Sequence, residues 1–404
     1  MERICEISPL AHLPDDRMPN ADPFAPEIPE PVLEDLRRRL TTIRWPHVIG
    51  EDDWVYGVPQ AWLKDMADYW AHEWNWNSTA TAMAAFDHYL ADMDGIPVHF
   101  LHVPGKGPAP KPLILTHGWP WTFWDYKDVI GPLSDPAAFG GDAADAFDVV
   151  VPSLPGFGFS TPLTSAGIDV AEVARLWVRL MQDVCGYERF AAHGGDWGAL
   201  VTAHLGHAHA QSLIGAHLAL PLIPGVDRAS VPREAYAEDE QWMLERAAQS
   251  GPLIRSHVSV HTTDPQTLAY AMSDSPIGTA AWIWERRRNW SDCDGDVERA
   301  FDRDHLCTTA ALYWCTGAFT SSLRLYFEHF NKPWPLVHDR KPTVEAPTGF
   351  AIFPKDVVQM PRRVAAEHTD LRRWSVMPRG GHFGAAEAPD LIVDEIRSFF
   401  RDLS

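Results

Sequence analysis

Short apolar runs that alternate with helical patterns are the feature that most restricts the fold of this 404-residue chain. Each run is nearly continuous in apolar residues, which is typical of a strand that is buried on both faces. An amphipathic pattern over 171–184 separates the second run from the third. Strands of this kind joined by helices predict a parallel sheet covered on both faces, the α/β class. The runs are KPLILTHG (111–118), FDVVVPSLPG (147–156), RFAAHGGD (189–196) and LIGAHLAL (213–220).

The first hundred residues follow a different pattern. Residues 1–25 are rich in Pro and Asp, and we expect them to form an N-terminal arm. Apolar residues then recur at helical spacing over 29–46 and 59–74. The period changes to two around Asp94-Gly95, a dipeptide that favours a β-hairpin. The sequence therefore predicts an N-terminal helical extension and a first hairpin over 26–100.

The alternation resumes over 101–220 and then stops between Pro221 and Pro342. This interval carries helical patterns, for example over 232–251 and 305–330, and no convincing strand. Strand patterns return at TGFAIFP (348–354) and RRWSVMP (372–378), before a final helical pattern over 389–403. We expect 101–220 and 343–404 to form two parts of one core, with 221–342 as a helical lid. A separate C-terminal domain is the alternative, but it would have only about sixty residues and two strands.

The stretch HGGDWGAL (193–200) follows the third apolar run and has the spacing of a nucleophile elbow, Gly-x-Nu-x-Gly. This strained turn from strand to helix usually carries a serine, but Asp196 occupies the position here, between Gly194 and Gly198. A serine would make an acyl-enzyme, whereas a carboxylate can displace a leaving group at an sp³ carbon and form an alkyl-enzyme ester. Epoxides and alkyl halides are the substrate classes that suit this chemistry.

Two further residues follow later strands in the chain order of an α/β-hydrolase triad. Asp356 comes after GFAIFP, and His382 comes after WSVMPRGG. Open parallel sheets bind ligands at the carboxyl ends of their strands, so we expect these residues to meet Asp196 there. His382, held by Asp356, would be the general base that hydrolyses the ester. Candidate oxyanion donors are the backbone N–H of Trp197 and an N–H group in HGWP (117–120).

Composition and charge argue against several other function classes. The chain has 55 Asp and Glu against 34 Lys and Arg, so its surface does not suit nucleic acid. No apolar run approaches the roughly 18 residues of a membrane span, and no secretory signal is visible. Five scattered cysteines are typical of a reducing compartment. We therefore expect a cytoplasmic protein without a nucleic-acid partner or a membrane span. A homo-oligomer remains open.

Three histidines after the elbow raise the alternative of a metal site. On a helix, His204 and His207 share a face while His209 turns away, and the chain contains no His-Glu-x-x-His. We interpret them as structural or surface residues, and we expect neither a metal nor a cofactor.

The set of motifs makes the sequence similar to the epoxide hydrolases of the α/β-hydrolase superfamily, specifically the microsomal-type branch with an N-terminal helical extension. The resemblance implies an α/β-hydrolase fold with an inserted all-helical lid, and it extends from about residue 25 to the C-terminus. The matching stretches are RWP (44–46), LTHGWPWTFWDYKDVIGPL (115–133), VVPSLPGFGFS (150–160), GGDWG (194–198), DSPIGTAAWIWE (274–285), LYWCTGAFTSSLRLYFE (312–328), PTGFAIFPKD (347–356) and RGGHFGAAEAPDL (379–391).

The resemblance also implies a role for individual residues. Trp119 and Trp197 would supply the oxyanion N–H groups, and the Trp119–Pro120 bond would be cis. The catalytic set would be Asp196 as nucleophile, His382 as base, Asp356 as its acidic partner and Tyr326 as the lid tyrosine that hydrogen-bonds the epoxide oxygen.

One position departs from the family pattern. The family usually has a second lid tyrosine a few residues after a Ser-Gly pair, and His257 falls at or near that position here. A histidine could donate the same hydrogen bond to substrate, or the position could point elsewhere. Tyr270 is the other nearby phenol, but its place in a helical pattern favours core packing.

Three functions compete at this stage. The leading hypothesis is an epoxide hydrolase that converts a small apolar or aromatic epoxide and water into a vicinal diol. A haloalkane or haloacid dehalogenase would use the same triad but would not need the proton donor Tyr326. A non-catalytic binding protein is a third class, against which the intact triad argues. Four tryptophans of the lid could line an apolar pocket or could be packing residues, namely Trp282, Trp284, Trp290 and Trp314.

Overall fold

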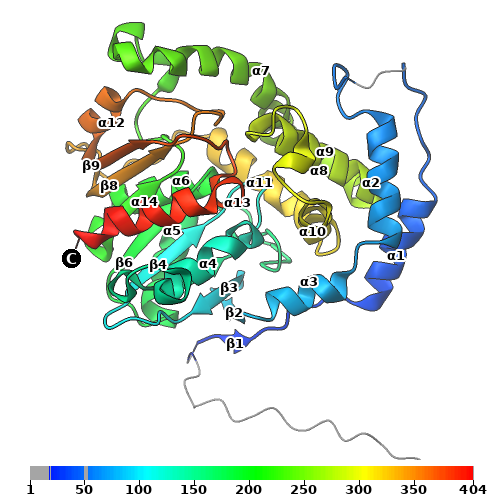
Figure 1. The fold of residues 1–404 in the computed structure, drawn as a ribbon, viewed down its shortest axis with the longest axis horizontal. Helices are drawn as coiled ribbons and strands as arrows, with labels where there is room; N and C mark the ends of the chain where they lie inside the picture. Colours follow the sequence, from blue (N-terminus) through cyan, green and yellow to red (C-terminus); the bar gives the residue numbers. More distant parts are fainter. Residues whose placement is uncertain (1–17, 19, 50–52, 404) are drawn as a thin grey trace, which may run out of the picture.

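The computed structural model describes residues 18, 20–49 and 53–403, so most of the expected N-terminal arm lies outside the described residues. A nine-stranded sheet forms the centre of the molecule, in the order β1-β2-β3-β5-β4-β6-β7-β8-β9 (Figure 1). The strands are β1 (Asp22–Pro23), β2 (Asp87–Asp92), β3 (Pro97–Val103), β4 (Lys111–Thr116), β5 (Phe147–Pro152), β6 (Phe190–Gly194), β7 (Leu213–Leu218), β8 (Val344–Ile352) and β9 (Thr369–Val376).

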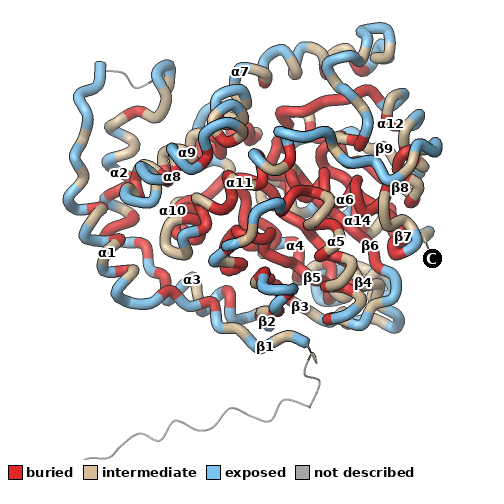
Figure 2. Tube along the Cα trace, turned by 180° about the vertical axis from the view of Figure 1, so that it is seen from behind, coloured by how far each residue is buried: buried red, intermediate tan, exposed pale blue. Residues whose placement is uncertain are grey.

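The neighbouring strands β5, β4, β6, β7, β8 and β9 are parallel. At the other edge, β1, β2, β3 and β5 pair in turn as antiparallel strands. The four apolar runs are β4, β5, β6 and β7, which confirms the predicted parallel sheet. Every residue of β6 and β7 is buried, and Figure 2 shows this burial at the centre of the molecule. Strands buried on both faces need helices on both faces.

Two pairs of helices cover the two faces of the sheet. Neighbouring residues of a strand point to opposite faces, and on β7 Gly215 faces Phe399 of α14, whereas Ala216 faces Gly206 of α6. Helix α4 packs on α14, and α5 packs on α6. Their bounds are α4 (Lys127–Ser134), α5 (Val170–Arg179), α6 (Trp197–Ala208) and α14 (Pro389–Arg401), with the short α12 (Arg362–His368) and α13 (Gly384–Glu387) before α14.

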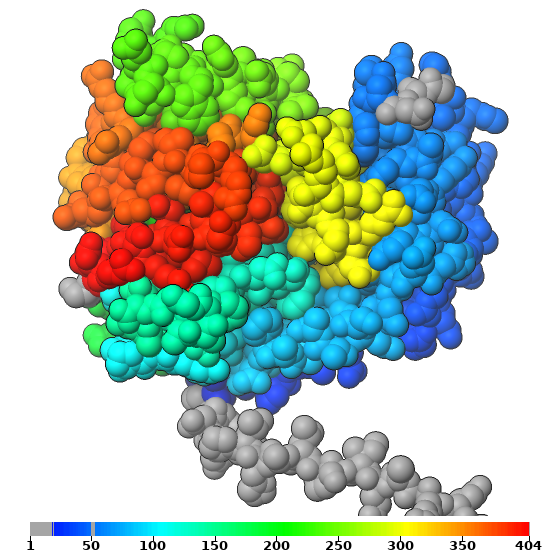
Figure 3. All heavy atoms as spheres, viewed as in Figure 1, coloured from blue at the N-terminus to red at the C-terminus, as the bar shows by residue number. Residues whose placement is uncertain are grey.

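In the part of the chain that the structure describes, three α-helices precede the hairpin, namely α1 (Glu30–Thr41), α2 (Gln60–His72) and α3 (Trp76–Met83). The hairpin turns at the predicted dipeptide, where Asp94 and Gly95 have φ of 62° and 83°. Two positive φ values in a two-residue loop define the type I′ turn that matches the twist of the flanking strands. Helix α1 contacts α9 (Pro276–Trp290), and α2 contacts α10 (Arg303–Trp314). Figure 3 shows this N-terminal part (blue) beside residues near 300 (yellow).

Helices fill the segment between β7 and β8, and residues 219–343 contain no strand. We call this segment the helical insertion. Its helices are α7 (Gln241–Thr263), α8 (Pro265–Asp274), α9 (Pro276–Trp290), α10 (Arg303–Trp314) and α11 (Ala318–Phe330). Within the described residues, no helix is both long enough and apolar enough to cross a membrane.

The helical patterns of the insertion differ from the structure at two places. The pattern over 232–251 becomes α-helical only at Gln241, after two 3₁₀ turns over Arg233–Ala235 and Glu238–Glu240. Just before α7, the Glu240 carboxylate accepts the backbone N–H groups of Ala237 and Arg362. The pattern over 305–330 divides into α10 and α11 at Gly317, whose φ is 71°. A positive φ is outside the helical region, so the chain changes direction there.

Candidate active site

Asp196 lies at the turn between β6 and α6, as the elbow spacing predicts. Strand β6 ends at Gly194 and α6 begins at Trp197, and between them Asp196 has φ 51° and ψ −125°. A non-glycine residue in this region is strained, and such strain is often found at functional sites. The turn directs the carboxylate to the carboxyl edge of the parallel strands, where β4 and β8 also end.

Three glycines allow the elbow to approach the neighbouring backbone. A Cβ atom at Gly198 would lie 1.9 Å from the carbonyl oxygen of Thr116 in β4. One at Gly194 would lie 2.2 Å from the carbonyl of Gly198, and one at Gly118 would lie 2.2 Å from Oδ1 of Asp196. Such distances are far below van der Waals contact, so the elbow requires glycine at these positions.

The structure brings His382 between the carboxylates of Asp196 and Asp356. Nδ1 of His382 lies 2.8 Å from Oδ1 of Asp356, and Nε2 lies 3.2 Å from Oδ2 of Asp196. The Nε2 contact is an ion-pair distance, but it is not aligned as a hydrogen bond. His382 and Asp356 are buried, and they follow β9 and β8 as the chain order predicts.

Trp119 and Trp197 both present backbone N–H groups near Asp196. The N–H of Trp119 donates to Oδ1 of Asp196 at 2.7 Å, and the Trp119–Pro120 bond is cis as the resemblance implied. Trp197 is the first residue of α6. An N–H in the first turn of a helix has no partner within that helix and carries part of the positive end of the helix dipole.

Asp196 opens onto a cavity of about 260 Å³ between the sheet and the helical insertion. Tyr326 of α11 lines this cavity together with His382, and its ring packs edge-on against Trp197 at 4.7 Å. Burial, together with the charge of Asp196, raises the pKa of Tyr326 well above its ordinary value, so the phenol stays protonated. The remaining wall is mostly aliphatic, with Leu200, Leu220, Leu222, Ile254, Val258, Val357 and Val358.

His257 of α7 also lines the cavity. Its ring stacks on Trp119 at 5.3 Å and meets Tyr326 edge-on at 5.5 Å, and its Nδ1 has no hydrogen-bond partner among the described residues. Burial lowers the pKa of His257 well below its ordinary value, and the neighbouring His261 lowers it further. His257 is therefore neutral. Tyr270 is 73% exposed, so the expectation of core packing for it is wrong, because α8 turns this residue to the surface.

Of the four insertion tryptophans considered in the sequence (Trp282, Trp284, Trp290 and Trp314), only Trp290 lines the cavity among the described residues. Trp284 packs against Trp62 and Trp70 of α2, and the indole of Trp314 donates to the carbonyl of Ser273. Trp284 therefore serves packing between the insertion and the N-terminal helices, and the Trp314 hydrogen bond lies within the insertion.

The protonation of His382 depends on its two carboxylates. Burial alone would lower its pKa, but Asp356 and Asp196 outweigh burial and raise the pKa to about 10. A third acid, Glu387, contacts the loop that carries His382. Its carboxylate accepts the backbone N–H groups of Gly381 and Phe383. Burial raises the pKa of Glu387 to about 7, although these N–H groups and His382 oppose the rise.

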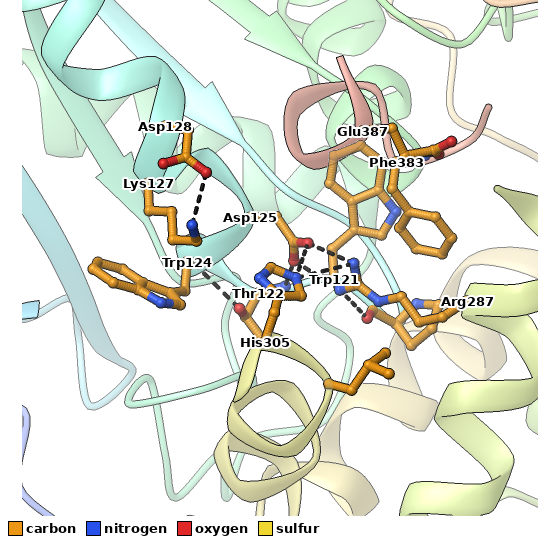
Figure 4. Close-up of polar contacts among 12 residues, drawn as sticks. Trp121, Thr122, Trp124, Asp125, Lys127, Asp128, Arg287, His305, Phe383 and Glu387 are labelled. Atoms are coloured by element: carbon orange, nitrogen blue, oxygen red, sulfur yellow. Dashed lines mark hydrogen bonds and ion pairs between the residues drawn. The ribbon is translucent and has the colours of Figure 1, made fainter. Parts of the chain in front are cut away.

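A buried polar cluster next to the site was not anticipated from the sequence. Asp125 follows the HGWP loop, and its carboxylate contacts Arg287 of α9 and His305 of α10 (Figure 4). The pattern Thr122-x-x-Asp125 could have indicated a capping box, which the structure contains. No sequence pattern indicated a buried role for Arg287, because it is the middle residue of three consecutive arginines.

Two of the three histidines after the elbow have side-chain partners within the protein. Nδ1 of His204 accepts the indole N–H of Trp334, and Nε2 of His207 accepts the backbone N–H of Val337. Within residues 18, 20–49 and 53–403, no group of three His, Cys, Asp or Glu side chains is arranged to hold a metal ion.

Two family models match the chain. The model described as "Epoxide hydrolase N terminus" matches residues 21–126, and "alpha/beta hydrolase fold" matches residues 111–256. The first covers the N-terminal helices, the hairpin and the HGWP loop. The second covers the strands from β4 to β7 and the elbow.

Similar proteins agree with both matches. A Stigmatella aurantiaca protein whose name places it among the epoxide hydrolases is 38% identical over 382 residues, covering 94% of this chain and 85% of its own. Epoxide hydrolase 1 of Oryctolagus cuniculus is 32% identical, with 93% and 88% covered. The structure of Aspergillus niger epoxide hydrolase has the same fold, with a TM-score of 0.81 at 24% identity and with 98% and 99% covered. The chain is an enzyme of the epoxide hydrolase family, built on the α/β-hydrolase fold.

Proposed function

We propose that the enzyme opens its epoxide through a covalent ester on Asp196. The observation that carries the proposal is the environment of this carboxylate, in which Oδ1 accepts the Trp119 N–H and Oδ2 faces His382. Oδ2 then attacks an epoxide carbon, and Oδ1 becomes the carbonyl oxygen of the ester. Asp196, His382, Asp356 and Tyr326 are the catalytic residues in this account.

In the alkylation step, the new bond joins Oδ2 to carbon while the carbon–oxygen bond of the ring breaks. The released oxygen takes the phenolic proton of Tyr326, which lines the same cavity as Asp196. The imidazolium of His382 then returns a proton to Tyr326 through solvent. This transfer becomes favourable because esterification removes the charge of Asp196 that raised the pKa of His382.

In the hydrolysis step, neutral His382 takes a proton from water, and the hydroxide adds to the ester carbonyl. Negative charge develops on Oδ1, where the N–H groups of Trp119 and Trp197 stabilise it. The tetrahedral intermediate then collapses as the bond between the acyl carbon and Oδ2 breaks. The leaving alkoxide takes the proton of the added hydroxyl, which gives the diol and the Asp196 carboxylate. His382 is again the imidazolium, so the two steps together consume one epoxide and one water.

His257 takes the place of the second proton donor in our proposal. Its unpaired Nδ1 and its place in the cavity wall support this role, and the stacked ring of Trp119 fixes its orientation. Because His257 is neutral, it donates from a neutral N–H group. The aliphatic wall favours a small apolar or aromatic epoxide.

We further propose that residues 221–342 act as the lid over a core formed by 101–220 and 343–404. The cavity between the sheet and α7, α9 and α11 supports this division. A reducing, cytoplasmic location is supported by Cys185, Cys293, Cys307 and Cys315, which are all free thiols.

A dehalogenase would need the same carboxylate and base. The indole Nε1 of Trp197 is buried and has no partner among the described residues, so it could bind a halide. Two points favour the epoxide hydrolase over the dehalogenase. The similar proteins are named epoxide hydrolases. A halide also leaves without taking a proton, so a dehalogenase would not need the proton that Tyr326 supplies. We therefore expect diol from a panel of aryl and alkyl epoxides and no halide release from matched alkyl halides.

The His382→Gln variant tests the covalent step. Without a base, Asp196 should still open the epoxide but should not release the diol, so the protein mass rises by the mass of the substrate. Asp196→Asn is the control and should show no mass increase. A His382→Gln protein that is folded and neither gains mass nor turns over would contradict the proposal.

A further inference from the structure

The segment that follows Trp119 is held by residues outside its own loop. The carbonyl of Pro120 accepts a hydrogen bond from Nη2 of Arg287 at 2.9 Å, and the carbonyl of Trp121 accepts one from the hydroxyl of Tyr313 at 2.7 Å. Arg287 lies on α9 and Tyr313 on α10. The helical insertion therefore holds the backbone immediately after the Trp119 N–H.

Asp125 completes this support from the core side. Its Oδ2 accepts the backbone N–H of Thr122 at 2.7 Å, and its two oxygens accept from Nη1 and Nη2 of Arg287 at 2.6 and 2.8 Å. Nε2 of His305 donates to Oδ1 at 3.1 Å. The side chains of Asp125 and Arg287 are fully buried, and Figure 4 shows Arg287 and His305 converging on Asp125.

The guanidinium of Arg287 also contacts the loop that carries His382. Its carbon lies 4.2 Å from the ring centroid of Phe383, the residue after His382. Helix α9 contacts this loop a second time, because the carbonyl of Trp290 accepts the backbone N–H of His382 at 2.8 Å. Arg287 thus contacts both loops that carry the hydrolysis machinery.

We propose that Arg287 is a positioning residue that fixes the Trp119 N–H for the ester-hydrolysis step. The inference rests on the proposed oxyanion role of Trp119. A buried pair of charges is a weak source of stability, since apolar residues of similar volume often serve as well. The planar guanidinium of Arg287 can hold the Asp125 carboxylate and the Pro120 carbonyl together, which the ammonium group of a lysine cannot do.

The two chemical steps should respond differently when this support is lost. In alkylation, negative charge leaves the Asp196 carboxylate, so displacement of the Trp119 N–H should slow this step little. In hydrolysis, negative charge develops on Oδ1, and the same displacement weakens its stabilisation. A general loss of folded protein would lower the active fraction but would not change either rate constant per active site.

The experiment measures both rate constants for Arg287→Lys by rapid quench and mass spectrometry of the ester, with styrene oxide as the probe epoxide. We expect hydrolysis to slow about tenfold or more, with alkylation within about threefold of wild type. Arg373→Lys is the matched control, because Arg373 also pairs with a carboxylate through two nitrogens, on Glu395, away from the site. It should leave both rate constants unchanged.

Tyr313→Phe provides a second, milder variant that retains the buried ring and keeps the inference testable if Arg287→Lys does not fold. It removes only the hydrogen bond to Trp121, and it should also slow hydrolysis selectively. An unchanged ratio of hydrolysis to alkylation in a folded variant would overturn the inference. Absence of any ester in the wild-type enzyme would instead overturn the proposed covalent mechanism.

Discussion

Nε2 of His382 lies 3.2 Å from Oδ2 of Asp196, while the other oxygen of the same carboxylate accepts the N–H of Trp119. The two oxygens therefore have different environments before any substrate binds. In the proposed mechanism, one oxygen is held where charge develops, and the other faces His382 and the cavity. Under that proposal, this asymmetry assigns the carbonyl and ether oxygens of the ester.

The first prediction concerns the pKa of His382. Asp356 and Asp196 raise it to about 10 in the resting enzyme, with Glu387 and His257 as the other titratable neighbours. Asp196→Asn removes one negative charge, as esterification does, so the imidazolium is less favoured and the pKa should fall well below 10. An NMR titration of the His382 ring measures this change.

The exposed Asp128→Asn serves as the control for that titration and should leave the His382 pKa in place. The same reasoning predicts that ester hydrolysis speeds up as pH rises through the lowered pKa, since only neutral His382 can accept a proton. A His382 pKa that is the same in Asp196→Asn and wild type would contradict the electrostatic link between alkylation and base activation.

Tyr326→Phe should slow alkylation on the order of 100-fold, because the opening ring loses a donor to its developing negative charge. Ester hydrolysis should change little. Tyr270→Phe is the matched control, since this phenol also lies in the insertion but is 73% exposed. Stopped-flow measurement of alkylation distinguishes the two variants, and a wild-type alkylation rate in Tyr326→Phe would remove the phenol from the mechanism.

His257→Phe keeps a ring that can stack on Trp119 but removes both nitrogens. We expect slower alkylation with hydrolysis of the ester unaffected. His257→Tyr should recover much of the rate, because a phenol can donate to the same oxygen. Because His257 is already neutral, it loses no proton as pH rises from 6 to 7. His257 should therefore cause no fall in the wild-type alkylation rate over this range. Equal alkylation rates in wild type and His257→Phe would show that His257 is a wall residue only.

The elbow should not tolerate a side chain at Gly198. A Cβ atom there would lie 1.9 Å from the Thr116 carbonyl, so Gly198→Ala should lower the free energy of unfolding by about 3 kcal/mol or more. Gly251→Ala, inside α7 with no atom within 4 Å of the added Cβ, should instead raise it by roughly 0.5–1 kcal/mol. Urea denaturation measures both, and an unchanged Gly198→Ala would contradict the packing of the elbow on β4.

The sequence predicted the parts of the fold that depend on local patterns. Continuous apolar runs identified β4 to β7, and Asp94-Gly95 identified the hairpin, because a type I′ turn needs two residues that accept positive φ. Chain order alone placed Asp356 and His382 after two later strands. The structure then brought His382 within hydrogen-bond distance of Asp356 and within ion-pair distance of Asp196.

Other features depend on contacts between distant segments, which no local pattern encodes. Arg287 and Asp125 are 162 positions apart, and neither has a neighbour in the sequence that indicates the pairing. The side chain of Glu240, just before α7, likewise binds the backbone of Arg362, 122 positions away. Tyr270 fitted an apolar helical pattern, but among the described residues no element covers its side chain, which is 73% exposed.

Single-turnover hydrolysis in ¹⁸O-labelled water tests the central claim most directly. Enzyme in excess over epoxide should incorporate one ¹⁸O into the Asp196 carboxylate, because water attacks the ester carbonyl and not the epoxide carbon. Peptide mass spectrometry should find the label on the peptide that contains Asp196, and the diol of that first turnover should be unlabelled. Label in the diol alone, with an unlabelled Asp196, would mean direct attack of water on the epoxide and would contradict the covalent mechanism.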